Sequence, residues 1–338
     1  MLALLAVAAA GYQPATSPKT RLRRLFEGAS DPVLACPISQ KPLRGEGAVL
    51  GLESRRWLVG GDGERYPVNP VYADLLPTSA TAANGLTPDD LRRELLDLLS
   101  TRVQTGTFRS PLTAFLYERG WRQNFANAGF PGIDKEYAEV FEFFKPAHAG
   151  VVVDMSCGSG LMTRRLLRSN SFKRVLALDY SEAMLTETKR RVDEEGIPSD
   201  KLTLCRADVA SLPLQNASVD AMHAGAAMHC WPRLEEGLRE IVRVLKPDGL
   251  FFATTFLKGA YGITAGQSGG ANGFRFFDGT KELEDLLVAA GFPADGVQVR
   301  KEGRGCAIIR ACKAGRRGLG TEVKSSAFVV GVGEGVDV

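Results

Sequence analysis

The sequence predicts an α/β protein whose mostly parallel sheet is covered by helices on both faces. From residue 150 onward, short runs of β-branched and apolar residues alternate with longer amphipathic runs. The first such run, at 151–153, is continuously apolar, as expected for a parallel strand that is buried on both faces. An acidic residue and a glycine-containing turn follow it directly. The order of strand, acid, turn and helix is typical of a βα unit that brings its backbone close to a nucleotide-like ligand.

Each element of the alternation has its own signal in the sequence. Predicted strands, identified by apolar and β-branched runs, cover residues 151–154, 175–179, 202–206, 219–224 and 249–256. Predicted helices, identified by their periodicity, cover residues 161–169, 181–194, 234–245 and 281–290. Ser181 is expected to cap the second helix, and Gly291 is expected to end the fourth. A turn is predicted at 246–249, and a hairpin-like pair at 297–300 and 306–312.

Residues 30–77 are predicted to form a small β unit that resembles a zinc ribbon. Two short strands are expected at 57–59 and 65–68, separated by glycine-rich turns. The unit opens with Cys36-Pro37-Ile38-Ser39, in which Ser39 stands where a second ligand cysteine is expected. One thiolate cannot hold a structural zinc ion, which takes about four ligands. We therefore expect this unit to be free of metal and to serve in packing.

The remaining segments are predicted to lie outside this core. Residues 86–148 form a helical extension with helices expected at 91–99, 115–125 and 133–144. Residues 149–312 form the main domain, and residues 313–338 form a flexible tail. Residues 1–28 are expected to be a targeting leader, because a ten-residue apolar run precedes a basic, hydroxylated and acid-free stretch. This order resembles the bipartite leaders of algae with complex plastids. The alternative is a disordered leader that has no targeting function.

Composition narrows the functional classes. The net charge is only +3, which gives no support to a nucleic-acid binder built on charge. The six cysteines show no CxxC pair, so neither a zinc-binding ribbon nor a disulfide framework is indicated. The apolar run at the N-terminus is too short to span a bilayer as a helix.

The turn after the first strand indicates the type of ligand. Asp154 precedes the sequence Ser156-Cys157-Gly158-Ser159-Gly160, in which the glycines allow unusual φ values and close backbone approach. A phosphate-binding GxGxxG would need a third glycine at position 163, where the sequence has threonine. A ligand without a phosphate fits better, and S-adenosylmethionine (SAM) is the candidate. A tight turn without a ligand is the alternative.

Three further strand ends support this site. Asp179 ends the second strand, where an acid accepts hydrogen bonds from both ribose hydroxyls. Asp208 and Val209 follow the third strand and are expected to meet the adenine, through the carboxylate and the backbone N–H respectively. Ala224 begins a stretch of small residues after the fourth strand, against which the methionine end of SAM can lie. Each acid alone could be a helix cap, but acids at successive strand ends are not easily explained in that way.

These motifs carry a family resemblance. The strings VVVDMSCGSG, LALDYSEAML, RADVASLPL, DAMHAGAAMHCWP and RVLKPDGLFFATTF resemble the successive motifs of class I SAM-dependent methyltransferases of the type 11 group. YERGWRQNF, GFPG and the upstream CPI are similar to the chloroplast, plastoglobule-associated methyltransferase-like proteins of plants and algae, relatives of the ubiquinone/menaquinone C-methyltransferases. The resemblance covers about residues 30–312. Departures are Ser39, Asp248 in a turn usually written PGG, and the glycine-rich tail.

The resemblance implies a Rossmann-like class I methyltransferase fold with SAM as cofactor. It also implies SAM-binding roles for Asp154, Ser156, Gly158, Gly160, Asp179, Tyr180, Asp208 and Val209. It does not identify a catalytic base. His223 and His229 flank the expected methyl-donor end and are candidates, since imidazole titrates near neutral pH. A structural role is the alternative for His223, and packing or helix entry is the alternative for His229. Tyr117, Trp121 and Arg122 are expected either to close over the ligand or simply to pack.

Three functions remain open on this reasoning. The leading hypothesis is a plastid methyltransferase that acts on a small, lipophilic, prenylquinone-like acceptor, without nucleic acid and with peripheral association to lipid bodies or the thylakoid surface. An rRNA base methyltransferase is the second, although the stretch after the fourth strand lacks the Asn/Asp-Pro-Pro-Tyr/Phe motif that binds an exocyclic amine. A SAM-binding protein of lipid bodies without catalytic activity is the third.

Overall fold

The computed structural model describes residues 30–46, 56–80, 125, 128–261 and 274–314. The predicted leader, the helix at 91–99 and nearly all of the helix at 115–125 lie outside these residues, as do Tyr117, Trp121 and Arg122. Nearly all of the predicted tail lies outside them as well.

The centre of the fold is a parallel sheet, as predicted. Its strands are β6 (Val151–Met155), β7 (Arg174–Asp179), β8 (Leu202–Arg206), β9 (Val219–Ala224) and β10 (Leu245–Phe256). They pair in the order β8-β7-β6-β9-β10, all in parallel. An antiparallel pair, β12 (Cys306–Cys312) and then β11 (Val297–Glu302), continues the sheet beyond β10.

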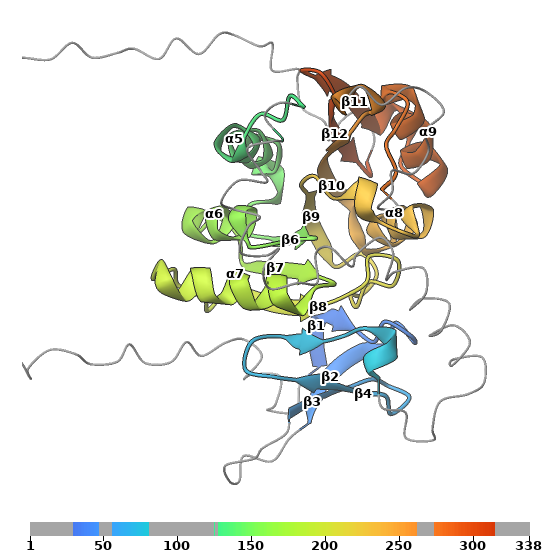
Figure 1. Ribbon diagram of the computed structural model, residues 1–338. Helices are drawn as coiled ribbons and strands as arrows, with labels where there is room; N and C mark the ends of the chain where they lie inside the picture. The colour runs from blue at the N-terminus through green and yellow to red at the C-terminus, as the bar shows by residue number, and fades with distance from the viewer. Residues whose placement is uncertain (1–29, 47–55, 81–124, 126–127, 262–273, 315–338) are drawn as a thin grey trace, which may run out of the picture.

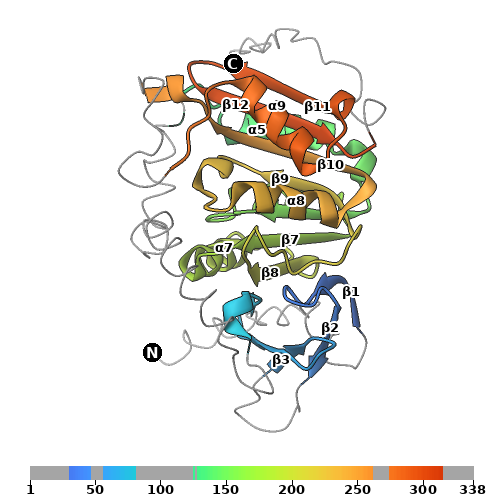
Figure 2. The same ribbon diagram turned by 90° about the vertical axis from the view of Figure 1, so that its right-hand side faces the viewer.

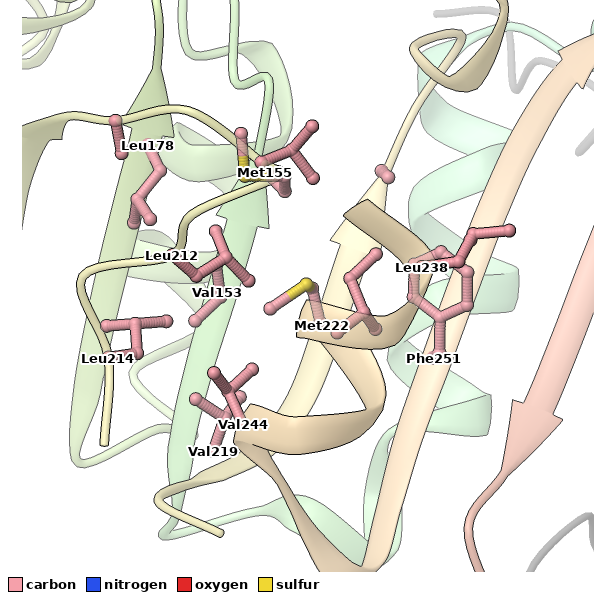
Figure 3. Packing of buried hydrophobic residues seen from close by; sticks show 14 of the residues in the cluster. Val153, Met155, Leu178, Leu212, Leu214, Val219, Met222, Leu238, Val244 and Phe251 are labelled. Atoms are coloured by element: carbon pink, nitrogen blue, oxygen red, sulfur yellow. The ribbon is translucent and has the colours of Figure 1, made fainter. Parts of the chain in front are cut away.

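Helices cover both faces of this sheet (Figure 1). On one face lie α5 (Ile133–Phe143), α6 (Leu161–Ser169) and α7 (Glu182–Glu194), and on the other lie α8 (Leu234–Val244) and α9 (Thr280–Ala290). Single 3-10 turns occur at η1 (Pro77–Ser79), η4 (Lys145–Ala147), η5 (Met228–Cys230), η6 (Lys258–Tyr261) and η7 (Ala294–Gly296). Each face therefore has its own apolar layer. Figure 3 shows part of one layer, where Leu238 and Val244 of α8 face strand side chains such as Met222.

The predicted caps are confirmed, but one predicted turn is wrong. The Ser181 hydroxyl accepts a hydrogen bond from the Met184 N–H at 3.4 Å, and Gly291 ends α9 with φ 118°. The turn predicted at 246–249 is instead part of β10, which begins at Leu245 directly after α8. The register against β9 shifts between Leu245 and Leu250, so these residues are taken up as an irregularity in the strand.

The N-terminal residues extend the same sheet. The strands β1 (Ser30–Ala35), β2 (Pro42–Glu46), β3 (Arg56–Val59), β4 (Arg65–Val68) and β5 (Ala73–Asp74) pair antiparallel in sequence order. β5 then pairs in parallel with β8, so the described strands form a single 12-stranded sheet (Figure 2). The sequence predicted β3 and β4 but not β1, β2 or β5, whose short runs show no clear alternation.

A buried ion pair joins the N-terminal strands to the parallel sheet. The Arg174 Nη1 donates to both carboxylate oxygens of Asp31 at 2.7 and 2.9 Å, and both side chains are only 1% exposed. The Arg174 Nε donates to the Thr203 hydroxyl at 3.1 Å. Burial by itself would raise the pKa of Asp31, but the guanidinium of Arg174 outweighs it and lowers that pKa. The pair therefore stays charged at neutral pH.

Cys36 lies in a tight turn beside the ring of Tyr66. Its sulfur lies 3.2 Å from the Tyr66 hydroxyl and accepts a hydrogen bond from the Ser39 N–H at 3.3 Å. Within the described ranges, no three side chains from His, Cys, Asp and Glu gather as metal ligands would. The likeness of this unit to a zinc ribbon stays a prediction. Within the same ranges, no helix has the length and apolar character needed to cross a membrane.

Candidate active site

A cleft opens at the carboxyl ends of the parallel strands, between the loops that follow β6, β7, β8 and β9. Its empty space, including the part open to solvent, is about 980 Å³. β7 and β8 lie on one side of β6, and β9 and β10 lie on the other. The winding of the sheet thus reverses at β6, which is where open α/β sheets bind their ligands.

The turn after β6 has the backbone that the sequence predicted. Ser156, Gly158 and Gly160 have φ values of 55°, 56° and 80°. Ser156 and Gly158 line the cleft, whereas Gly160 begins α6 and packs against α7. A Cβ on Gly160 would lie 2.6 Å from the Thr188 Cγ2. Gly160 therefore allows close packing of two helices, which is a supporting role rather than a contact with the cleft.

Asp179 lies at the cleft wall and holds the turn in place. Its Oδ2 accepts a hydrogen bond from the Gly158 N–H at 2.9 Å, and its Oδ1 accepts one from the Ser181 N–H at 2.8 Å. Burial raises the pKa of Asp179 to about 6, because the backbone hydrogen bonds offset only part of the lost hydration. The carboxylate is therefore ionised at neutral pH and borders the cleft, as the sequence predicted for a ribose partner.

Asp208, Val209 and Tyr180 line the same side of the cleft. The Asp208 Oδ2 accepts a hydrogen bond from the Arg233 Nη2 at 2.7 Å, and its Oδ1 accepts one from the Ala210 N–H at 2.9 Å. The ring of Tyr180 lies 5.6 Å from the guanidinium carbon of Arg206. The lining of the cleft thus includes an acid, an apolar side chain and an aromatic ring, which suits a nucleoside.

The end of β9 places small residues along the cleft, shifted by one position from the prediction. Ala224 is fully buried within the strand, and Gly225, Ala226 and Ala227 line the cleft instead. The Trp231 Nε1 donates to the Ser156 hydroxyl at 3.0 Å, so the loop after β9 is tied to the turn after β6.

Asp154 and His223 border a smaller hollow that adjoins the cleft at Ser156 and Gly225, and they form a buried cluster with Glu136. The His223 Nδ1 lies 2.9 Å from the Asp154 Oδ1, and its Nε2 lies 3.1 Å from the Glu136 Oε1. All three side chains are 2% exposed. The other Asp154 oxygen accepts from the Thr163 hydroxyl at 2.5 Å. Burial by itself would lower the pKa of His223, but the two carboxylates outweigh it and raise that pKa to about 9. His223 is thus a cation held between two acids.

This cluster predicts a loss of stability at alkaline pH. A histidine whose folded pKa is raised stabilises the fold below its unfolded pKa, and this stabilisation is lost as pH rises through the folded pKa. From 6.5 to about 9, it is worth on the order of 3 kcal/mol. The free energy of unfolding in urea should therefore fall between pH 7 and pH 10 in the wild type and much less in His223→Gln. His148→Gln, which replaces a histidine outside the cluster, should behave like the wild type; equal pH slopes for all three proteins would contradict the assignment.

His229 lies at the opposite end of the cleft among aromatic rings. Its ring centroid lies 4.7 Å from that of Phe256, 5.5 Å from that of Phe274 and 6.2 Å from that of Phe276. Phe125 packs edge-on against Phe256 and also lines the cleft. Burial lowers the pKa of His229 to about 3, so its imidazole is neutral at physiological pH. This end of the cleft is apolar and carries no charge from His229.

The chemistry of the lining fits SAM better than a phosphorylated ligand. Of the described residues that line the cleft, Arg233 is the one with a permanent positive charge, and it is ion-paired with Asp208 and Glu236. Phosphates are usually bound by free cations or by a glycine-rich nest of N–H groups, whereas here the Gly158 N–H is directed to Asp179. The carboxylates of Asp179 and Asp208 and the ring of Tyr180, beside a turn that contains two glycines, suit a nucleoside with a sulfonium.

Comparisons with known proteins agree with this geometry. Residues 153–253 match the family model described as methyltransferase domain. An uncharacterized chloroplastic methyltransferase of Arabidopsis thaliana is 40% identical over 67% of this chain and 62% of its own length. A second one from the same plant is 46% identical over 56% of each chain. The ubiquinone/menaquinone biosynthesis C-methyltransferase of Bartonella henselae is 30% identical over 31% of this chain and 39% of its own.

The fold, the cleft and the family match together define a class I SAM-dependent methyltransferase domain, whose cofactor is SAM. The chain is similar to the chloroplastic methyltransferases of Arabidopsis and spans 62% and 56% of the lengths of the two relatives named above.

Several residues of the site were missed by the sequence analysis. Glu136 comes from α5, where it shares the buried face with Val140 and Phe143. An acid on an apolar stripe is the signal that could have identified it. Trp231 and Arg233 follow the small-residue stretch after β9. Nothing in the neighbouring sequence indicates that Trp231 donates to Ser156 or that Arg233 donates to Asp208. Phe125 enters the cleft from a distant part of the chain.

Proposed function

We propose that this protein transfers a methyl group from SAM to a small, lipophilic, prenylquinone-like acceptor. The observation that carries the proposal is one cleft with two chemically different ends. One end has acids that follow β7 and β8, and the other has the aromatic rings of Phe125 and His229. The family resemblance of the SAM-binding motifs and the printed name of the Bartonella relative support the same activity.

In the proposed site, the side chains and backbone of the chain orient the cofactor. Asp179 accepts hydrogen bonds from the ribose hydroxyls, and Asp208 and the Val209 backbone contact the adenine. Ser156, Gly158 and Tyr180 border the rest of the SAM molecule. Asp154 borders the adjoining hollow beside Ser156, and Gly160 and Ala224 support the site through packing. When bound, SAM supplies an electrophilic methyl group on a sulfonium. Its transfer disperses positive charge, so that holding donor and acceptor in line can provide much of the acceleration.

The acceptor end favours an uncharged, planar, apolar molecule. Phe125 and His229 line it, and the ring of His229 packs against Phe256, Phe274 and Phe276. Flat rings bind to such edges and faces more readily than acids do. Neutral His229 can exchange a hydrogen bond with an acceptor hydroxyl, but its lowered pKa makes it a weak base. Both ring nitrogens of His223 are held by carboxylates, so we assign it to positioning.

The pKa of Asp179 predicts how SAM affinity depends on pH. The ionised carboxylate accepts the ribose hydroxyls, and below about pH 6 its protonated form loses that capacity. The dissociation constant of SAM, measured by calorimetric titration, should therefore rise as pH falls from 7.5 to 5 and stay level between pH 7.5 and 8.5. Asp179→Asn cannot titrate and should bind weakly with no such dependence. A wild-type affinity that is constant from pH 5 to 8 would contradict this role.

A plastid location is part of the proposal. Both Arabidopsis relatives are named chloroplastic, and residues 1–28 have the composition of a targeting leader. Association with plastoglobules would bring the enzyme to its lipophilic acceptor. A fluorescent fusion of the full chain in algal cells tests this: signal confined to the cytosol would exclude it.

Two experiments in sequence test the function. The first is calorimetric titration of the purified protein with SAM, and absence of binding below millimolar concentration would rule the proposal out. The second is incubation with methyl-labelled SAM and a plastid lipid extract, followed by identification of the labelled product. A labelled quinol confirms the acceptor class. SAM binding without any labelled lipid would favour a non-catalytic SAM-binding protein, and strongly salt-dependent RNA binding would favour an rRNA enzyme.

A further inference from the structure

The Gly129-Phe130-Pro131-Gly132 stretch before α5 packs against the turn between β11 and β12 through two glycines. A Cβ on Gly129 would lie 2.6 Å from the Gly303 Cα, and a Cβ on Gly303 would lie 2.5 Å from the Gly129 Cα. Both glycines have positive φ, 95° and 53° respectively. The two backbones are thus in direct contact, and neither position accepts a side chain without displacing the other.

Hydrogen bonds connect this contact to Phe125. The Gly305 N–H donates to the Ala128 carbonyl at 2.8 Å, and the N–H groups of Ala128 and Phe130 both donate to the Phe125 carbonyl at 3.1 Å. The Gly305 carbonyl in turn accepts from the Leu257 N–H at 2.8 Å, at the end of β10. The turn after β11 therefore joins the end of β10 to the backbone of Phe125.

This arrangement sets the position of Phe125, which lines the cleft. Its ring lies 5.1 Å from the Phe256 ring at 79°, and Phe256 lies 4.7 Å from His229 at 81°. Phe130 completes the packing at 4.5 Å from Phe256. We call the packed rings of Phe125, Phe130 and Phe256 the aromatic wall. Its position depends on the separation between Gly129 and Gly303, where two backbones meet with no side chain between them.

We infer that the contact between Gly129 and Gly303 positions Phe125 and thereby determines which acceptor the cleft takes. The inference rests on the proposed methyl transfer, and it assigns acceptor selection to the C-terminal hairpin formed by β11 and β12. A side chain at position 303 pushes the segment that carries Phe125 away from the hairpin. The aromatic wall then moves relative to His229, and a flat acceptor loses its edge contact.

The test compares Gly303→Ala with Gly196→Ala in the full chain. Gly196 also has positive φ, 61°, but no atom lies within 4 Å of the Cβ it would gain. Both variants carry the same kind of backbone strain, and only one introduces the clash. 4-Fluorophenylalanine is placed at position 125, and its fluorine resonance is recorded in the wild-type, Gly303→Ala and Gly196→Ala backgrounds. We expect the resonance to shift in Gly303→Ala and to stay in place in Gly196→Ala.

Kinetics with a 1,4-naphthoquinol as acceptor provide the functional readout. Gly303→Ala should raise the acceptor KM by about tenfold, the upper range for one aromatic contact, and leave the SAM dissociation constant unchanged. Gly196→Ala should match the wild type in both. An unshifted resonance in Gly303→Ala, or a shifted one with an unchanged acceptor KM, overturns the inference. Wild-type protein that binds no SAM, or that binds SAM but does not methylate the naphthoquinol, overturns the proposed function instead, whereas the fluorine resonance still tests the positioning of Phe125.

Discussion

Replacing Asp179 with alanine is expected to weaken SAM binding by at least about 100-fold. The carboxylate borders the cleft and is proposed to accept two ribose hydroxyls, and hydrogen bonds to a charged group are each worth about 1.5–3 kcal/mol. Alanine also releases the Gly158 and Ser181 N–H groups that the carboxylate now orients. Calorimetric titration with SAM at pH 7.5 measures the effect.

Asp193→Ala is the matched control for this variant. Asp193 is an acid on α7 that pairs with Lys189 at the surface, so its loss should leave SAM affinity unchanged. Unfolding in urea shows whether each variant is folded before titration. If Asp179→Ala bound SAM within threefold of the wild type, the ribose role of Asp179 would be wrong and the cofactor would have to lie elsewhere in the cleft.

Replacing Asp31 with alanine is expected to lower the free energy of unfolding by about 3–5 kcal/mol, because it leaves a buried guanidinium without its counter-ion. Arg174 is 1% exposed, so water cannot replace the lost carboxylate without opening the seam between β1 and the parallel sheet. The pKa of Asp31 is lowered in the fold. Its stabilisation is therefore present above the ordinary carboxyl pKa and is lost as pH falls through the folded pKa. Urea unfolding at pH 7 and at acidic pH measures both effects.

Two further variants separate the ion pair from general damage to the N-terminal strands. Asp62→Ala removes an acid from the same region whose partner, Lys41, is exposed, and it should change stability little. The double variant Asp31→Leu with Arg174→Met replaces the pair with apolar groups and should recover most of the loss. A loss of less than 1 kcal/mol for Asp31→Ala would show that solvent or another group compensates Arg174.

Local patterns were sufficient for the parallel core and for one wall of the cleft. The apolar strands, the Ser181 cap and the positive-φ turn depend on residues that are close in sequence, and the structure has them as predicted. Asp179 and Asp208 line the cleft because the carboxyl ends of parallel strands share one edge of a sheet. The sequence pattern did not indicate which of the residues at that edge line the cleft and which are buried within the strands. Ala224 was expected at the ligand but is fully buried within β9, whereas Asp154 borders a smaller hollow that adjoins the cleft at Ser156 and Gly225.

The sequence by itself determined the α/β class, the order of its parallel strands and helices along the chain, and the edge of the sheet at which the cleft opens. These properties follow from hydrophobic periodicity and from the backbone freedom of glycine, which act over a few residues. The tertiary structure alone decided that the N-terminal strands extend the sheet at β8, that Glu136 completes the His223 cluster, and that Gly303 supports Phe125. Each of these depends on burial and contact between segments far apart in the chain, for which the local pattern carries no signal.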